Sequence, residues 1–162
     1  YLDTITTLNF NGKLKIYRKG DIKFSYRNSS FKNNEIICDA TFVCEKGDKD
    51  TIKSNKILAS NKRKESQPLR FRSAGSIFKN PSLSIAAGYL IDKAGLKGTK
   101  IGNAEISSKH ANFIVNLGGA KSDDILELIK LIIKIVKKEF DIVLELEVKL
   151  LGYNKQNLYK EI

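Results

Sequence analysis

A nine-residue stretch, Ser73–Pro81, concentrates side chains that could do chemistry: Ser-Ala-Gly-Ser-Ile-Phe-Lys-Asn-Pro. Ser76 supplies a hydroxyl, Lys79 a cation and Asn80 an amide. Gly75 removes a Cβ beside them, so the backbone can come close to a flat or bulky ligand. The proline that ends the stretch favours an extended Asn80, whose amide then projects from a stiff segment. We interpret the stretch as part of a functional site, with a polar surface loop as the alternative.

Two charged residues elsewhere are further candidates. Arg27 follows Tyr26 in an aromatic-rich segment, and a guanidinium can donate two parallel hydrogen bonds to a carboxylate or phosphate. Glu147 lies on the polar side of an alternating segment near the end of the chain. Taken alone, each has a plain alternative: an arginine stacked on Tyr26, and a carboxylate on a solvated strand. A hydrolase is disfavoured, because the Gly-x-Ser-x-Gly pattern of hydrolase nucleophiles is absent around Ser76.

The elements that must position these residues fall into two parts. In the first, Asn11-Gly12 predicts a hairpin between a strand ending near Phe10 and a strand over 13–17. Residues 36–45 predict another strand, and residues 48–59 a short polar helix. The charged residues 61–72 predict a linker or mobile loop, so we place a domain boundary there.

The second part of the sequence predicts helices that alternate with short strands. A helix is expected over 84–94, with Ser84 as its N-cap and Gly95 as its stop. Short strands follow around residue 101 and over 104–106, then a strand over 111–116. Residues 122–139 have apolar residues at helical spacing and predict the clearest helix. Strict alternation over 144–150 predicts a final strand. The whole pattern indicates an α+β fold whose second part is a mixed α/β domain.

Charge favours anionic ligands without pointing to nucleic acid. The chain has 162 residues and a net charge of +11. A basic surface attracts polyanions, but the lysines are scattered and no arginine–aromatic cluster resembles a nucleic-acid reader. A small phosphorylated ligand needs only one or two of these cations. No run of about 18 apolar residues is present, so we expect no membrane span.

The cysteines and the histidine predict a reducing environment and no metal centre. Cys38 and Cys44 share the parity of apolar neighbours in an expected strand, so we expect buried thiols. An extended chain would hold them roughly 20 Å apart, too far for a disulfide. His110 is the only histidine, and no cluster of metal ligands surrounds it. These features fit a cytoplasmic protein.

Several motifs together resemble one enzyme family. They are Tyr-Arg-x-Ser-x-Phe-Lys from Tyr26, Gln67-Pro68-Leu69, the Ser73–Pro81 stretch, the Ser107–Asn116 segment with its Lys-His-Ala-Asn-Phe core, and Leu-Glu-Leu-Glu-Val from residue 144. In this order and across nearly the whole chain, they resemble the UDP-N-acetylenolpyruvoylglucosamine reductase (MurB) family of peptidoglycan synthesis. The sequence is similar to the shorter type within that family.

The resemblance implies a flavoenzyme and assigns roles to residues. NADPH would reduce FAD, and the flavin would pass hydride to the enolpyruvyl double bond of a UDP-sugar, giving UDP-N-acetylmuramate for the cell wall. Ser76 would protonate the carbon next to the carboxylate, while Arg27 and Glu147 would stabilise the enol intermediate. The other implied positions are Asn80, Lys79 and Gln67 for substrate, and Tyr26, Gly75 and His110 for cofactor.

The resemblance also implies a domain organisation. Residues 1–60 would be the end of the FAD-binding domain, 61–152 the UDP-sugar domain, and 153–162 a tail. The chain opens in an apparent strand, so we expect that an N-terminal portion of the FAD domain is missing and that this chain alone binds FAD weakly or not at all. We expect a monomer.

Three positions depart from the family pattern: Asn28 stands for Asp, Asn103 for Gly and Arg72 for Pro. Asn28 removes a negative charge beside Arg27, which weakens the prediction of how that guanidinium is oriented. Two other hypotheses stay open, a catalytically silent UDP-sugar-binding module and a basic RNA-binding domain.

Overall fold

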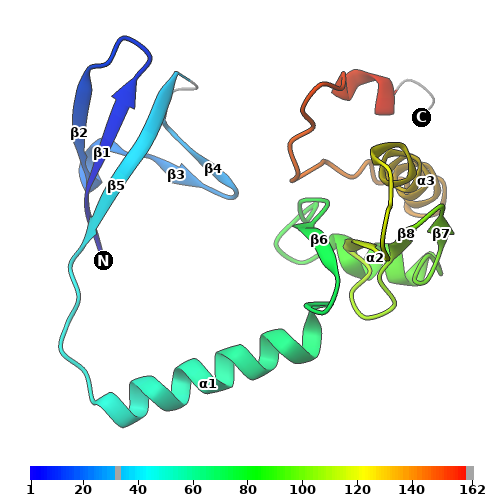
Figure 1. Ribbon diagram of the computed structural model, residues 1–162, viewed down its shortest axis with the longest axis horizontal. Helices are drawn as coiled ribbons and strands as arrows, with labels where there is room; N and C mark the ends of the chain where they lie inside the picture. The colour runs from blue at the N-terminus through cyan, green and yellow to red at the C-terminus, as the bar shows by residue number, and fades with distance from the viewer. Residues whose placement is uncertain (32–33, 160–162) are drawn as a thin grey trace. The chain divides into compact units, whose positions relative to one another are not determined.

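The computed structural model describes residues 1–31 and 34–159 and divides the chain into two compact units, Tyr1–Asn55 and Lys56–Ile162 (Figure 1). Lys32, the last residue of the first family motif, lies outside the described residues, as do residues 160–162 of the expected tail. Antiparallel sheets with helices in separate segments confirm the α+β class.

The first unit is built on a three-stranded antiparallel sheet in the order β2-β1-β5. Its strands are β1 (Leu2–Asn9), β2 (Leu14–Arg18) and β5 (Glu35–Phe42). The predicted hairpin is confirmed: Gly12 takes φ +74° in the turn, and its N–H donates to the Asn9 carbonyl at 3.0 Å. Between β2 and β5 come the short 3-10 helix η1 (Lys19–Asp21) and the small hairpin β3 (Phe24–Ser25) and β4 (Asn28–Ser29).

The expectation that Cys38 and Cys44 are buried is wrong, because both are exposed. A β-bulge between Thr6 and Thr7 shifts the register of β1 against β5. Ile36 therefore lies opposite Leu8 on one sheet face, whereas Ala40 lies opposite Ile5 on the other. Every residue of β5 after Glu35 is exposed, so neither face of this strand could bury a thiol.

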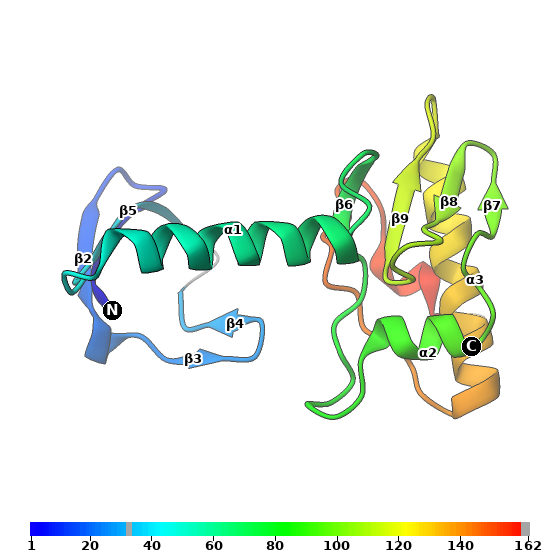
Figure 2. The same ribbon diagram turned by 90° about the horizontal axis from the view of Figure 1, so that it is seen from below.

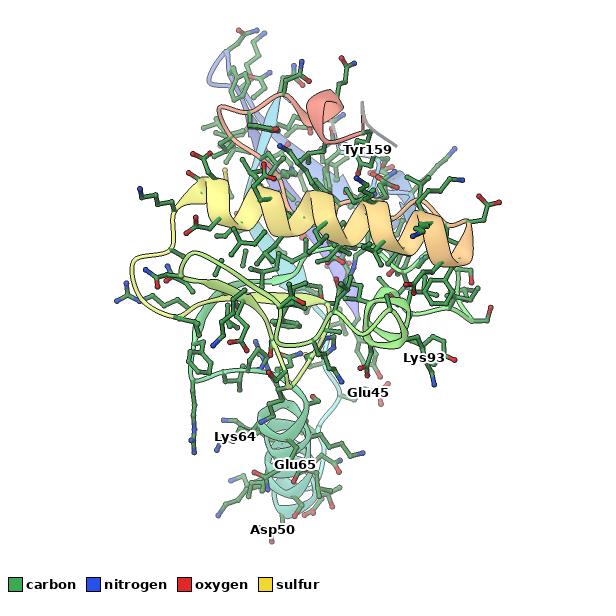
Figure 3. All side chains as sticks on the ribbon, turned by 90° about the vertical axis from the view of Figure 1, so that its right-hand side faces the viewer. Glu45, Asp50, Lys64, Glu65, Lys93 and Tyr159 are labelled. Atoms are coloured by element: carbon green, nitrogen blue, oxygen red, sulfur yellow. The ribbon has the colours of Figure 1, made fainter. Side chains whose placement is uncertain are left out.

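Helix α1 (Lys49–Ser66) is longer than predicted and includes the first half of the expected loop. Residues 61–66 contain no glycine or proline, and their Lys, Arg and Glu side chains are good helix formers. The helix ends just before Gln67-Pro68, where proline disfavours continuation. None of its residues is buried, and Asp50, Lys64 and Glu65 point outward in Figure 3.

The second unit packs helices against a four-stranded antiparallel sheet in the order β6-β9-β8-β7 (Figure 2). The strands are β6 (Arg72–Ser76), β7 (Lys100–Ile101), β8 (Ala104–Ile106) and β9 (Phe113–Asn116). The helices are α2 (Ala87–Lys93) and α3 (Ser122–Phe140), and the 3-10 helix η2 (Lys155–Leu158) follows near the end. Helix α3 matches its prediction and contacts β7, β8 and α2.

The core of this unit joins the apolar stripe of α3 to the sheet and to α2. Among its fully buried side chains are Phe78, Ile91, Ile106, Leu128, Ile129, Ile132, Ile133, Val136 and Leu144. Because burying a Leu, Ile or Phe side chain contributes about 1.5–3 kcal/mol, this cluster accounts for most of the stability of the unit. The same cluster anchors the residues that follow β6.

Two predicted elements differ in the structure. Helix α2 begins at Ala87 rather than near Ser84, since the Asn80 side-chain oxygen accepts the Ala87 N–H at 3.1 Å. The predicted strand over 144–150 is an extended segment with a single bridge, Phe78 to Leu146. Its alternation still holds in burial, because Leu144 and Leu146 are buried whereas Glu145 is exposed.

Candidate functional site

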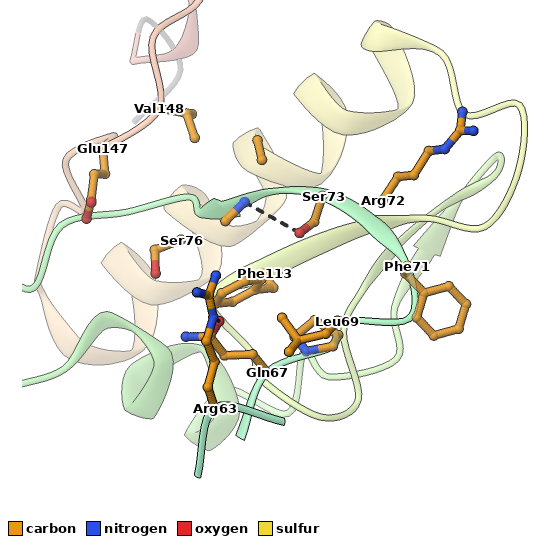
Figure 4. Close-up of a pocket in the computed structure, with 13 residues that line it drawn as sticks. Arg63, Gln67, Leu69, Phe71, Arg72, Ser73, Ser76, Phe113, Glu147 and Val148 are labelled. Carbon is orange, nitrogen blue, oxygen red and sulfur yellow. Dashed lines mark hydrogen bonds between the residues drawn. The ribbon is translucent and has the colours of Figure 1, made fainter. Parts of the chain in front are cut away.

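A pocket of about 730 Å³ in the second unit is lined by Ser76 and Glu147 together. Thirteen residues surround it: Arg63, Gln67, Pro68, Leu69, Phe71, Arg72, Ser73, Ala74, Gly75, Ser76, Phe113, Glu147 and Val148 (Figure 4). Glu147 is the single acid among these lining residues, beside the cations Arg63 and Arg72 and the rings of Phe71 and Phe113. Such a mixture suits an organic anion with an apolar part.

A bulge in β6 brings Ser76 into this pocket. Ser73 pairs with Val115 and Ser76 with Phe113, so β6 holds one more residue than β9 over this stretch. The extra residue puts Ser76 on the same sheet face as Ser73, although their spacing in an unbroken strand would place them on opposite faces. Gly75 takes φ +82° in the bulge, and its N–H donates to the Ser73 hydroxyl at 3.5 Å (Figure 4).

Gly75 also leaves open space at the pocket wall. A Cβ built at this position would meet no atom within 4 Å. The glycine is therefore required by its backbone conformation and not by crowding within the chain. The wall next to Ser76 is consequently open to the flat ligand that the sequence predicted.

Backbone pairing with Ile77 positions Glu147 in the wall of the pocket that Ser76 also lines. The Glu147 N–H donates to the Ile77 carbonyl at 2.8 Å, and the Lys79 N–H donates to the Glu145 carbonyl at 2.8 Å. Leu146, between the two glutamates, is 3% exposed and anchors the segment in the core. The pocket thus receives a hydroxyl and a carboxyl from two segments far apart in the sequence.

Sequence reasoning missed Arg63 in this site. Arg63 lies one helical turn before Gln67, and its Nε donates to the Gln67 side-chain oxygen at 3.1 Å. In Figure 4 both side chains extend from the end of α1 into the pocket. Only a helix over residues 61–66 aligns the two, so the prediction of a loop there hid the contact. The i, i+4 spacing of Arg and Gln before a proline was the available signal.

Lys79 and Asn80 do not line this pocket. The Lys79 ammonium contacts the Glu145 carboxylate at 2.7 Å, and the Asn80 oxygen receives the Ala87 N–H. In the structure these two side chains hold the ends of the segments that flank the pocket.

His110 is packed within the second unit, beside the pocket wall. Its ring meets Phe113 edge-on with centroids 4.7 Å apart, and its Nδ1 accepts the Asn112 N–H at 3.2 Å. Burial, and to a smaller extent the charge of Lys97, hold the pKa of His110 below its usual value. His110 is therefore neutral near pH 7 and does not itself line the pocket.

We expect this histidine to make folding sensitive to acid. Because the pKa is lower in the folded chain than the unfolded value near 6.5, the unfolded chain binds a proton first as the pH falls. His110 thus contributes stability above that value and loses it as the pH falls through the folded pKa. Urea unfolding at pH 7.5 and 5.5 should show a larger loss for the parent than for His110→Asn, which keeps an acceptor near Nδ1.

The difference should be small, because the ring is partly exposed to water. His110→Asn unfolding with the same pH dependence as the parent would contradict this assignment.

Arg27 and Tyr26 belong to the first unit, at the tip of the β3–β4 hairpin. The Arg27 guanidinium carbon lies 5.7 Å from the Tyr26 ring centroid, and both side chains are exposed. Arg27 takes φ +53°, an uncommon conformation for a residue other than glycine. The gathering of Arg27 with Ser76 and Glu147 in one pocket stays a prediction.

Within residues 1–31 and 34–159, no group of three or more His, Cys, Asp or Glu is placed to hold a metal ion. No helix in that part of the chain is long and apolar enough to cross a membrane.

A family profile and the similar curated proteins indicate the same enzyme family for this chain. Residues 67–151 match the profile of the UDP-N-acetylenolpyruvoylglucosamine reductase C-terminal domain. A reductase of that name from Clostridium novyi (strain NT) is 43% identical over 157 residues, covering 96% of this chain and 51% of the relative. One from Lactobacillus gasseri is 43% identical over 155 residues, covering 95% and 51%. The chain spans about half the length of these curated relatives.

A solved structure of the same family is also similar to this chain. The crystal structure of UDP-N-acetylenolpyruvylglucosamine reductase (MurB) from Thermus caldophilus superposes with a TM-score of 0.78 at 36% identity. The match covers 91% of this chain and 52% of that one.

Proposed function

Because the chain belongs to the UDP-N-acetylenolpyruvoylglucosamine reductase family, we propose that its pocket is the substrate-reducing part of such an enzyme. The observation that carries the proposal is the shared pocket of Ser76 and Glu147, the two residues of the second unit to which the resemblance assigns a catalytic role. The reaction adds hydride to the outer carbon of an enolpyruvyl ether and a proton to the inner carbon, in peptidoglycan synthesis.

The chain's residues act on the charge and the proton of this reaction. Hydride arriving at the outer carbon drives negative charge toward the substrate carboxylate, where a fixed cation stabilises it most effectively. We assign that role to Arg27. Glu147 would lie beside the same carboxylate either protonated or paired, since a bare second anion would oppose the reaction. The Ser76 hydroxyl gives its proton to the inner carbon and recovers one from solvent. The weak acidity of a serine is offset by the strong basicity of an enolate carbon.

We assign Arg63 and Gln67 a role in binding the substrate. Their side chains are held together at 3.1 Å on the pocket wall, and a paired guanidinium suits a phosphate or carboxylate of the substrate. Lys79 and Asn80 stay predicted substrate contacts, and their interactions with Glu145 and with α2 support a positioning role for both.

FAD would supply hydride received from NADPH. The open space at Gly75, on the same wall as Ser76, fits a flat ring system. His110 fits less well as a cofactor contact, because its ring is packed against Phe113 and its Nδ1 is already used. The assignments of Tyr26, a monomeric state and a cytoplasmic location stay predictions.

Two preparations test the proposal. We expect the purified 162-residue chain to carry little FAD, and a fusion to the half of the Clostridium novyi relative that it does not span to carry stoichiometric FAD. The fusion should oxidise NADPH rapidly only when UDP-N-acetylglucosamine enolpyruvate is present. A flavin-loaded fusion that binds this substrate without reducing it would support a silent binding module instead. A stoichiometric yellow spectrum from the chain alone would contradict the expected dependence on the other half.

A further inference from the structure

The last turn of helix α1 lacks one of its own hydrogen-bond donors. In an α-helix, the carbonyl of each residue accepts the N–H of the residue four positions further on. For Lys64 that residue is Pro68, which has no N–H. One position earlier the pattern is intact, since the Arg63 carbonyl accepts the Gln67 N–H at 3.0 Å. The Lys64 carbonyl therefore needs a donor from outside the helix.

Lys109 provides this donor, although it lies 45 residues further along the chain. Its Nζ donates to the Lys64 carbonyl oxygen at 2.6 Å. A cation at the C-terminal end of a helix also interacts favourably with the helix dipole. The backbone of Lys109 is held in turn by Ser107, which is 3% exposed. The Ser107 Oγ accepts the N–H groups of Lys109 and His110 at 3.2 and 3.3 Å. The buried Ser107 is thus linked to the end of α1 through the Lys109 side chain.

The segment that follows α1 borders two cavities. Four of its residues line both the pocket and a second cavity of about 680 Å³: Gln67, Pro68, Leu69 and Phe71. Leu69 and Phe71 are each 49% exposed, so packing constrains these side chains only in part. The position of such a segment is sensitive to the hydrogen bonds that hold its ends, because few buried apolar contacts oppose its movement.

We propose that Lys109 is a positioning residue for the substrate pocket. By holding the last turn of α1, its ammonium keeps Arg63 and Gln67 in place on the pocket wall, where the Arg63 Nε donates to the Gln67 side-chain oxygen at 3.1 Å (Figure 4). Lys109 itself does not line that pocket. The inference rests on the proposed substrate-binding role of Arg63 and Gln67, and Lys109 acts on the substrate only through these two side chains.

Lys109→Met tests the proposal in the fusion with the Clostridium novyi half, because methionine removes the ammonium and keeps an unbranched side chain. We expect KM for UDP-N-acetylglucosamine enolpyruvate to rise about 5- to 30-fold, the range expected for one lost hydrogen bond to a charged group. Since the contact is not made by a reacting group, kcat should stay within about threefold of the parent. Lys109→Arg keeps a cationic donor and should restore KM.

Lys138→Met is the matched control, because it removes the same charge from an exposed site in the last turn of α3. Its KM should equal that of the parent. An unchanged KM in Lys109→Met, an equal rise in Lys138→Met or no rescue by arginine would overturn the proposal.

A mutant cycle separates positioning from direct contact between Lys109 and the substrate. In an Arg63→Met/Gln67→Ala background, Lys109→Met should lower kcat/KM by less than about threefold, because the side chains that it positions are already absent. An equal loss in this background and in the parent would mean that Lys109 contacts the substrate itself, which would overturn the proposal.

Hydrogen exchange in the 162-residue chain tests the helix contact without any reductase activity. The Gln67 N–H should exchange about 5- to 30-fold faster in Lys109→Met than in the parent, whereas amides in the middle of α3 should be unchanged. Unchanged exchange at Gln67 would overturn the proposal. A parent fusion that reduces no enolpyruvyl substrate would overturn the proposed function, and the exchange result would still decide whether Lys109 holds the end of α1.

Discussion

Replacing Ser76 with alanine should lower the rate of enolpyruvyl reduction by about 10²–10⁴-fold, the usual contribution of a positioned proton donor. Ser76 lines the same pocket as Glu147, and alanine removes the hydroxyl proton without adding bulk. Ser76 is half-buried at the end of β6, so the variant should fold. Flavin reduction by NADPH should continue at the parent rate, because that step does not use this proton.

The measurement separates two half-reactions in the fusion with the Clostridium novyi half. Rapid mixing with NADPH follows flavin bleaching, and a second mixing with substrate follows its reoxidation. Only reoxidation should slow in Ser76→Ala, while the affinity for substrate should change little. Equal slowing of both steps would point to a distorted site instead of a missing proton.

Ser73→Ala is the matched control for this experiment. Ser73 lines the same pocket from the same strand, but its hydroxyl accepts the Gly75 N–H at a long 3.5 Å. We expect turnover within about threefold of the parent, since loss of a weak exposed hydrogen bond costs well under 1 kcal/mol. Comparable losses in both serine variants would contradict a specific role for Ser76.

Replacing Asn112 with alanine should destabilise the second unit by about 2–4 kcal/mol. The Asn112 side chain is 4% exposed and makes two hydrogen bonds with the backbone of Phe78, both at 2.9 Å. Its Oδ1 accepts the Phe78 N–H, and its Nδ2 donates to the Phe78 carbonyl. Alanine would leave both buried backbone groups without these partners, at about 1–3 kcal/mol for each buried group left unsatisfied.

Urea unfolding of the 162-residue chain measures this loss directly. Asn103→Ala is the control, because Asn103 is exposed and its backbone N–H and carbonyl, which alanine keeps, make hydrogen bonds. We expect that control to stay within about 0.5 kcal/mol of the parent. If Asn112→Ala unfolds at the parent urea concentration, the bridge is not a major tie between β9 and the segment after Ser76.

Much of this molecule could be predicted from local patterns. The Asn11-Gly12 turn and the apolar stripe of 122–139 each specify their element within a few neighbouring residues. The motifs around Ser76 and His110 were enough to indicate the family, which the comparisons then showed. In these cases the physical cause, a backbone preference or a helical period, lies within one short segment.

Other features depended on partners distant in the sequence. The bulge in β6–β9 reversed the side-chain parity and brought Ser76 onto the face of Ser73, and the bulge in β1–β5 placed Ile36 and Ala40 on opposite sheet faces. The 144–150 segment alternates like a strand, yet its pairing is limited to one bridge with Phe78. Register is set by which strands meet and where an extra residue is accommodated, and no single segment carries that information.

In the pocket, too, some features follow from the local sequence and others from contacts between distant segments. Ser76 and Glu147 could be singled out by residue type and context, and Gln67 by the family resemblance. Arg63 became part of the site because α1 continues to Ser66 and aligns Arg63 with Gln67. Asn112 lies within a predicted strand, and only the folded structure shows that its side-chain amide makes hydrogen bonds with the backbone of Phe78. Side-chain chemistry is a property of each residue, but the distances that join two residues arise only when the whole chain is packed.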